Sequence, residues 1–200
     1  MGRTHEEVVA TDQAAQAGER PLRADARRNR DRILSAAADA FATRGADTQM
    51  DDVARAAGVG VGTVYRHFPT KEALMGALVR RKFDTLQEAA DAALDVDDPW
   101  EAFAGTLRRG AEVMGADAAL RDALGRTPQA WELAAEERKR LDATMARVIR
   151  RAQDAGALRE DFTVDDIPML MCGVSAAMSS PAGWDWHRHL AFVLDGLRSR

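Results

Sequence analysis

Residues 48–68 read TQMDDVARAAGVGVGTVYRHF, and this stretch decides how the rest of the chain is interpreted. Val53 and Ala57 stand four residues apart, which predicts a helix that starts with a capping-box-like sequence at Thr48 and ends at Gly58. A second, shorter helix follows and stops against a proline. Two helices joined by a glycine-containing turn of three or four residues predict a helix-turn-helix.

The second helix of this pair has one apolar side and one outward side. Val64 and Phe68 lie four residues apart and are expected to face inward. The outward side combines small residues, which let the backbone approach a ligand closely, with hydrogen-bond donors and an apolar edge, a set that suits the major groove of DNA. Its members are Val61, Gly62, Thr63, Tyr65, Arg66 and His67.

The remaining sequence predicts an all-α fold. The chain has 40 alanines, 25 arginines and 13 valines but only 3 isoleucines among 200 residues, so helix formers dominate and β-branched residues are scarce. Apolar periodicity and glycine or proline stops predict about nine helices, at residues 25–44, 48–58, 61–68, 70–93, 100–114, 118–124, 128–155, 164–180 and 184–197.

Charge is distributed unevenly along the chain. The formal net charge is −4, yet residues 23–82 carry +5, whereas residues 1–22 carry −2 and residues 83–200 carry −7. A basic segment on an acidic body is typical of a small polyanion-binding unit attached to a domain with another task. Chance clustering of charge is the alternative explanation.

Several classes of protein are disfavoured. The sequence has no apolar run of about 18 residues and no signal-peptide core, so we expect a soluble, cytoplasmic protein. Cys172 is the single cysteine and can form neither an intrachain disulfide nor a zinc cluster alone. His187 and His189 leave opposite sides of a helix, which argues against a metal pair. No triad-like grouping occurs either, so we expect no metal, no cofactor and no enzyme.

A family resemblance becomes visible when the first helix is included. It reads Arg30-x-x-Ile33-x-x-Ala36-Ala37-x-x-x-Phe41-x-x-x-Gly45, and the helix-turn-helix continues as Val53-Ala54-x-x-Ala57-Gly58-Val59-x-x-Gly62-Thr63-Val64-Tyr65-x-His67-Phe68-x-x-Lys71-Glu72-x-Leu74. This pattern resembles the amino-terminal DNA-binding domain of the TetR family of bacterial transcriptional regulators. Gly60 departs from it, because many members have a serine there, and a glycine N-cap costs only a few tenths of a kcal/mol.

The resemblance implies a homodimeric, ligand-responsive repressor that binds a palindromic operator in double-stranded DNA. We expect a mobile arm at residues 1–22, a helix-turn-helix domain at 23–69 and a helical effector-binding and dimerisation domain at 70–200. Arginines crowd the predicted start of the first helix, where they oppose the helix dipole, so an external anion such as DNA phosphate is expected beside them. Besides the outward side chains of the recognition helix, the expected DNA contacts are Arg27, Arg28, Thr48, Gln49 and Lys71.

The carboxy-terminal part is expected to hold an effector pocket and a dimer interface. The resemblance places the pocket in the middle helices, where the aromatic and methionine candidates, which could equally fill the core, are Phe83, Trp100, Phe103, Met114, Trp131 and Met145. It assigns the interface to the last two helices, through Leu170, Gly173, Val174, Ala177, Met178, Leu190, Val193 and Leu194.

Two alternatives stay open. A helical small-molecule carrier or enzyme could contain a purely structural helical hairpin, although the basic segment argues against it. An activator would have the same DNA-binding sequence as a repressor.

Overall fold

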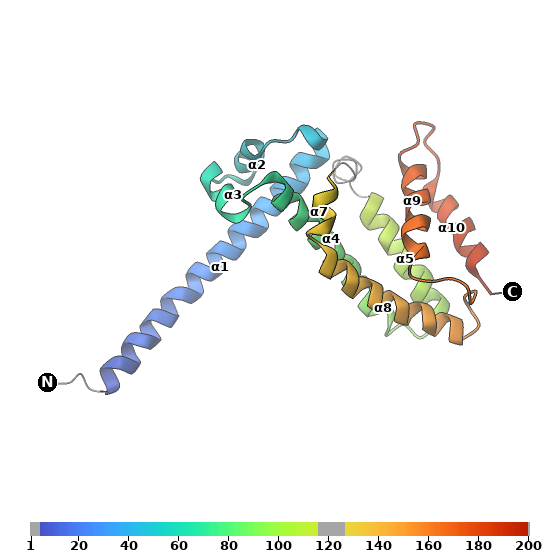
Figure 1. The fold of residues 1–200 in the computed structure, drawn as a ribbon, viewed down its shortest axis with the longest axis horizontal. Helices are drawn as coiled ribbons and strands as arrows, with labels where there is room; N and C mark the ends of the chain where they lie inside the picture. Colours follow the sequence, from blue (N-terminus) through green and yellow to red (C-terminus); the bar gives the residue numbers. More distant parts are fainter. Residues whose placement is uncertain (1–4, 116–126, 200) are drawn as a thin grey trace.

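The computed structural model describes residues 5–115 and 127–199, with side chains from residue 25 onward. Within these ranges the chain forms nine α-helices, which confirms the all-α prediction (Figure 1). They are α1 (His5–Arg44), α2 (Met50–Ala57), α3 (Val61–His67), α4 (Lys71–Ala93), α5 (Pro99–Gly115), α7 (Pro128–Glu132), α8 (Ala135–Asp154), α9 (Asp166–Met178) and α10 (Trp186–Leu197), with a 3-10 turn, η1 (Gly45–Asp47), after α1. The helix predicted at residues 118–124 lies outside the described residues. No helix in the described ranges is long and apolar enough to cross a membrane.

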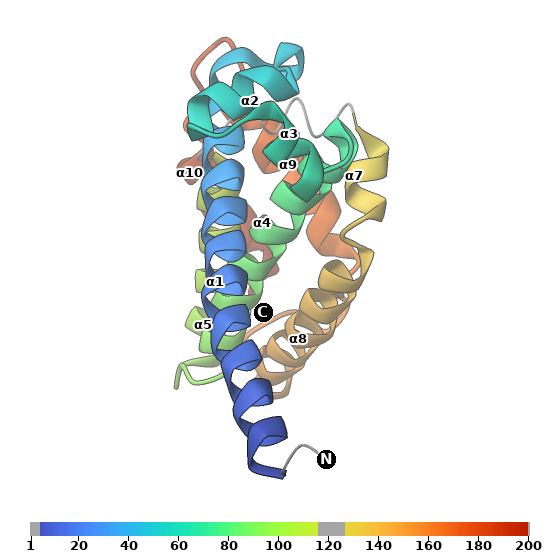
Figure 2. The same ribbon diagram turned by 90° about the vertical axis from the view of Figure 1, so that its left-hand side faces the viewer.

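Helix α1 begins at His5, so the predicted start at Asp25 is wrong. Alanine, glutamate, glutamine and arginine predominate in residues 5–24, and all four favour a helix even without an apolar stripe. A stripe is needed only where a helix packs against a core, and Figures 1 and 2 show the first part of α1 reaching well beyond the other helices. Arg27 and Arg28 therefore lie inside a continuous helix, and the dipole argument for an anion beside them does not hold.

Helix α2 begins one residue later than its sequence suggests. Its N-cap is Gln49, and not Thr48 as predicted. The Asp52 carboxylate accepts a hydrogen bond from the Gln49 backbone N–H at 3.2 Å, and the Gln49 side chain completes the capping box. At the other end Gly58 has φ 64°, the left-handed conformation expected of a glycine that ends a helix.

The buried apolar side chains form two separate cores. The first lies among α1, α2, α3, the first half of α4 and α7, and the second joins the end of α4 to α5, α8, α9 and α10. Helix α4 belongs to both, because Leu74 and Val79 are buried in the first core and Ala90 and Ala93 in the second. The two cores are therefore connected through one continuous helix.

The single helix predicted at residues 128–155 is interrupted at Leu133 and Ala134. Ala130 and Ala134 are fully buried in the first core, and the Leu133 carbonyl accepts a hydrogen bond from Arg80 Nη1 of α4 at 2.7 Å. No glycine or proline marks the break in the sequence. Tertiary packing of α7 against α4 is what separates it from α8.

The carboxyl end of α4 is held by a side chain from α8. The Arg151 guanidinium donates hydrogen bonds of 2.5 to 3.4 Å to the backbone carbonyls of Ala93, Leu94, Val96 and Asp97. Ala93 is the last residue of α4 and the other three residues follow it, so these bonds place a cation at the negative end of the helix dipole. Arg151 thereby fixes the end of α4 to α8.

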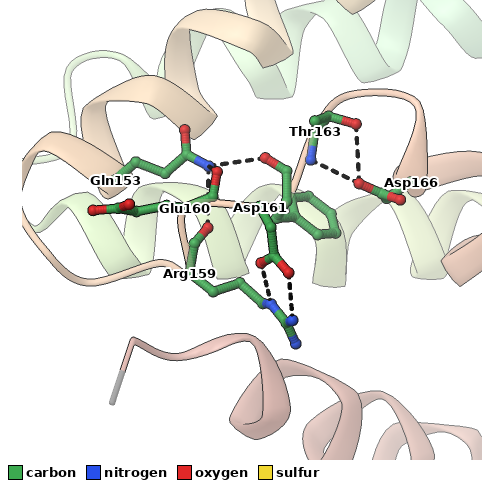
Figure 3. Close-up of polar contacts among 7 residues, drawn as sticks. Gln153, Arg159, Glu160, Asp161, Thr163 and Asp166 are labelled. Atoms are coloured by element: carbon green, nitrogen blue, oxygen red, sulfur yellow. Dashed lines mark hydrogen bonds and ion pairs between the residues drawn. The ribbon is translucent and has the colours of Figure 1, made fainter.

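The loop between α8 and α9 is held by polar side chains from the two helices that flank it (Figure 3). The Gln153 amide nitrogen donates to the carbonyls of Arg159 and Phe162 at 3.1 and 2.8 Å. The Asp166 carboxylate accepts hydrogen bonds from the backbone N–H and the hydroxyl of Thr163 at 2.7 and 3.0 Å. The start of α9 is therefore fixed relative to the end of α8.

The contact between α7 and α4 leaves no room for a side chain at Gly76. A Cβ atom there would lie 2.8 Å from Leu133 Cδ1 and 2.9 Å from Leu133 Cβ. We expect Gly76→Ala to lower the Tm, even though alanine is favoured over glycine in a helix by about 1 kcal/mol. The control is Gly105→Ala in α5, whose Cβ would have no atom within 4 Å and which should raise the Tm. Thermal unfolding followed by circular dichroism measures both.

Truncating the partner separates the clash from any other effect. In the double variant Gly76→Ala, Leu133→Gly, both the Cδ1 and the Cβ atoms that the new methyl group would meet are removed, so the two substitutions should be less destabilising together than their separate effects predict. If Gly76→Ala is as stable as Gly105→Ala, the close contact between α7 and α4 is wrong.

Candidate nucleic-acid interface

Helices α2 and α3 meet in the predicted helix-turn-helix. The Val59 backbone N–H donates to the Ala54 carbonyl at 3.1 Å across the turn at Gly58. Val53 of α2 and Val64 of α3 are completely buried and fill the joint between the helices. The outer side of α3 is thereby held at a fixed angle to the first core.

Helix α3 turns Val64 and Phe68 inward, as predicted. Tyr65 points outward and is 47% exposed, so its ring does not pack beneath α1. The other residues predicted on the outward side are all exposed or half-buried: Val61, Gly62, Thr63, Arg66 and His67. The structure thus assembles this whole set on one accessible helix.

The Arg66 side chain is folded back along α3. Its Nε donates to the Gly62 carbonyl at 3.1 Å, and its Nη2 donates to the Thr63 hydroxyl at 3.0 Å. The guanidinium is therefore held on the exposed surface of α3, so that less side-chain entropy is lost when it meets a ligand.

The structure contradicts the phosphate contact predicted for Thr48. This side chain is only 1% exposed, and its hydroxyl lies 2.9 and 3.1 Å from the carbonyls of Gly45 and Ala40. It stabilises the turn after α1 instead. Gln49, also predicted, is exposed at the start of α2 and remains a candidate contact.

Lys71 connects the start of α4 to the end of α1. Its Nζ donates to the Ala46 carbonyl at 2.6 Å and lies 5.7 Å from the centre of the Phe41 ring. A phosphate contact of Lys71 would replace or share this hydrogen bond, and it stays a prediction.

An ion-pair cluster connects α1 to α2, the first helix of the helix-turn-helix. Asp52 pairs with Arg44 of α1 at 2.6 Å and with Arg55 of α2 at 3.0 Å. The hydrogen bond from Arg44 and the one from the Gln49 backbone hold the pKa of Asp52 below its ordinary value. The cluster ties α1 to α2.

The arginines of α1 differ in their surroundings. Arg27 and Arg28 are exposed, and Arg28 pairs with Asp25 one turn earlier. Arg30 is half-buried, with its guanidinium 5.4 Å from the centre of the Phe68 ring at the end of α3. Arg30 therefore packs α1 against the end of the recognition helix, whereas Arg27 and Arg28 stay available at the surface.

The residues predicted to line one effector pocket lie in three places. Trp100 and Phe103 are 4% and 0% exposed and fill the second core, so the pocket assignment is wrong for them. Phe83 and Trp131 form an edge-to-face pair, with ring centres 6.1 Å apart, where α4 meets α7. A cavity among α4, α5, α8 and α9 is lined by the two methionines of the set, Met114 and Met145. The other residues of its wall, which the sequence did not indicate, include Leu86, Gly110, Ile167 and Met171.

The predicted dimer contacts are mostly buried or half-buried within the chain itself. Four of the eight residues are already buried within this chain: Val174, Leu190 and Leu194 in the second core, together with Ala177. Leu170, Met178 and Val193 are half-buried, and Gly173 is exposed. The large exposed apolar side chains of this region, which the sequence did not single out, are Met169, Trp184 and Phe192, at 72%, 65% and 61%. Helical periodicity identified the apolar residues of the last two helices, but the most regular apolar stripe of these helices faces the chain's own interior.

Metal binding finds no support in the described side chains. Across residues 25–115 and 127–199, no three histidine, cysteine, aspartate or glutamate side chains gather as possible ligands.

Comparison with known proteins adds the following similarities. Residues 33–78 match the family described as bacterial regulatory proteins, tetR family, and residues 98–199 match the SbtR-like transcriptional regulator C-terminal domain. A TetR transcription regulatory protein from Mycobacterium vanbaalenii, of known crystal structure, is 37% identical in sequence to this chain. The two structures superimpose with a TM-score of 0.66, and the match covers 89% of this chain and 99% of that one.

Two curated regulators are also similar. TcmR from Streptomyces glaucescens is 28% identical over 186 residues, which cover 86% of this chain and 78% of TcmR. An HTH-type transcriptional regulator of Staphylococcus aureus is 35% identical over 85 residues, which cover 41% of this chain and 44% of that protein. The chain thus spans less than half the length of this second relative.

The Asp52 cluster makes stability depend on pH in a defined direction. Because the folded-state pKa is depressed, Asp52 stabilises the fold above its unfolded pKa of about 3.9, and this contribution is lost as the pH falls through the folded pKa. Asp52→Asn should therefore lower the Tm at pH 7, and the difference from the unsubstituted chain should shrink toward pH 2–3. Asp51→Asn, which changes an exposed carboxylate in the same turn, is the control. A difference that does not change with pH would contradict this role of Asp52.

Proposed function

The chain belongs to the TetR family of bacterial transcriptional regulators, and we propose that it is a homodimeric repressor released from a palindromic operator by a small-molecule effector. Members of this family are DNA-binding regulators and not enzymes, and the chain carries their helix-turn-helix. This family membership disfavours the carrier or enzyme alternative.

One observation carries the proposal most directly: the exposed side of α3. Tyr65 and Arg66 lie on it next to Gly62. Because Gly62 has no side chain, the helix backbone is accessible there, between an aromatic hydroxyl and a guanidinium. Arginine reads guanine with two hydrogen bonds, and small residues allow a helix to sit deep in the major groove. The charge of +5 over residues 23–82 supports attraction to the phosphates.

A dimer explains how so short a helix attains operator specificity. Two recognition helices related by a two-fold axis read two major grooves about 34 Å apart, and this makes the operator a palindrome. We assign the dimer face to the outer side of α9, α10 and the loop between them, where Met169, Phe192 and Trp184 are exposed. Gly173 and Ala176, also exposed, allow two helices to approach closely there.

Release by an effector requires a connection between the two cores. Helix α4 provides it, since it starts beside α3 and its later part packs against α5 and α8. A hundredfold loss of operator affinity needs a coupling free energy of about 2.7 kcal/mol between the two sites, within the range found for allosteric proteins. In the proposed repressor, this loss of DNA binding switches transcription on.

The first experiment tests the reading surface. Tyr65→Ala should weaken binding to fragments selected from sheared genomic DNA by about tenfold or more, because it removes a contact worth at least ~1.4 kcal/mol. Gel retardation at fixed salt measures the affinity, and circular dichroism checks the fold. Val96→Ala, at an exposed apolar residue between α4 and α5, is the control. Equal affinity of the unsubstituted chain and the folded Tyr65→Ala variant would refute this docking.

The second experiment tests the dimer face. Phe192→Glu places a charge in the proposed interface and should raise the dimer dissociation constant at least tenfold, as measured by analytical ultracentrifugation. Val96→Glu introduces the same charge outside this face and should leave it unchanged. A dimer that tolerates Phe192→Glu without loss of affinity uses another surface.

A further inference from the structure

A small cavity lies where four helices of the second core meet. Its volume is about 100 Å³. Leu86 of α4, Gly110 of α5, Met145 of α8 and Ile167 of α9 each contribute to its wall. The cavity therefore touches the helix that carries the DNA-reading unit as well as three helices of the carboxy-terminal domain.

The wall of this cavity is apolar. None of the described residues that line it is charged, and Thr106 supplies a hydroxyl among otherwise apolar groups. That hydroxyl already donates its proton to the Ala102 carbonyl at 2.8 Å, so it offers a ligand an acceptor and not a donor. The cavity is partly open to solvent, so an ion placed here would lose part of its hydration without gaining a partner, which makes binding of charged molecules costly.

Methionines make the cavity adaptable in shape. Met114, Met145 and Met171 come from three different helices and face the same space. Methionine is unbranched and polarisable, so it adjusts to irregular apolar molecules and packs well against aromatic rings. An apolar protein cavity of about 150 Å³ binds benzene, and the present cavity is smaller, so its three flexible methionines must move aside to hold a molecule of single-ring size.

We propose that this cavity is a binding site for an uncharged, apolar molecule of single-ring size. The inference rests on the proposed function in one respect: that such a molecule acts as the effector. Contact with Leu86 gives the ligand direct access to α4, and contact with Ile167 and Met171 links it to α9. Filling the cavity changes the packing of α4 against the rest of the second core.

The ligand class is tested with three probes on the purified full-length chain. Benzene tests size, and nitrobenzene and benzoate have closely similar shapes but differ in charge. Isothermal titration calorimetry should show binding of benzene and nitrobenzene, with benzoate at least tenfold weaker than nitrobenzene. At roughly ten times its Kd, benzene should also raise the Tm by about 3–6 °C.

A matched pair of glycine variants locates the binding site. A Cβ at Gly110 would lie 3.7 Å from Met171 Cε and 3.8 Å from Leu86 Cδ2, so Gly110→Leu extends into the cavity and should abolish binding of benzene. Gly105→Leu, on the same helix with open space around its Cβ position, should leave binding unchanged. If Gly110→Leu does not fold, Ile167→Phe fills the same cavity from α9.

The outcomes separate this inference from the proposed function. Binding of benzene and nitrobenzene that the cavity-filling variant abolishes supports the site. Absence of binding to the unsubstituted chain, benzoate binding as tight as that of nitrobenzene, or unchanged binding in the filled variant overturns it. A chain that binds benzene but retards no DNA refutes the proposed function and leaves the ligand site standing, and the reverse result does the opposite.

Discussion

Helix α4 is shared by two hydrophobic cores, and the rest of the structure depends on this sharing. Six consecutive residues, from Leu74 to Val79, are buried in its first half, whereas its last turn closes the second core. Both ends are held by long cationic side chains, Lys71 on the carbonyl of Ala46 and Arg151 on the carbonyls that follow α4. A rearrangement of one core therefore alters the support of the other.

The helix-turn-helix could be predicted from sequence because its determinants are local. Gly58 supplies the left-handed turn, and Val53, Val64 and Phe68 follow helical spacing closely enough to identify the buried side of each helix. The N-cap of α2 lies one residue after the predicted position, and the reason is physical. Thr48 and Gln49 are both able to cap a helix, and only the tertiary contact of Thr48 with the end of α1 removes it from that role.

The carboxy-terminal domain was harder to predict because its packing is not local. Trp100 and Phe103 are of the aromatic type that lines ligand sites, but both are buried in the second core. There the ring of Phe103 packs edge-to-face against Phe162. Likewise, Val174 and Leu190 follow an apolar stripe that periodicity identifies but cannot assign to the chain's own interior or to a partner. The large exposed side chains of the same region stand out only once the fold shows what is already covered.

The four carbonyls gathered by Arg151 make the far end of α4 its fixed point. With 23 residues the helix is about 34 Å long, so a rotation of roughly 5° about that end displaces its first turn by about 3 Å. This displacement equals the length of a hydrogen bond, so it is enough to break a polar contact at the opposite end. A change in packing too small to alter the architecture of the second core is thereby magnified at the helix-turn-helix.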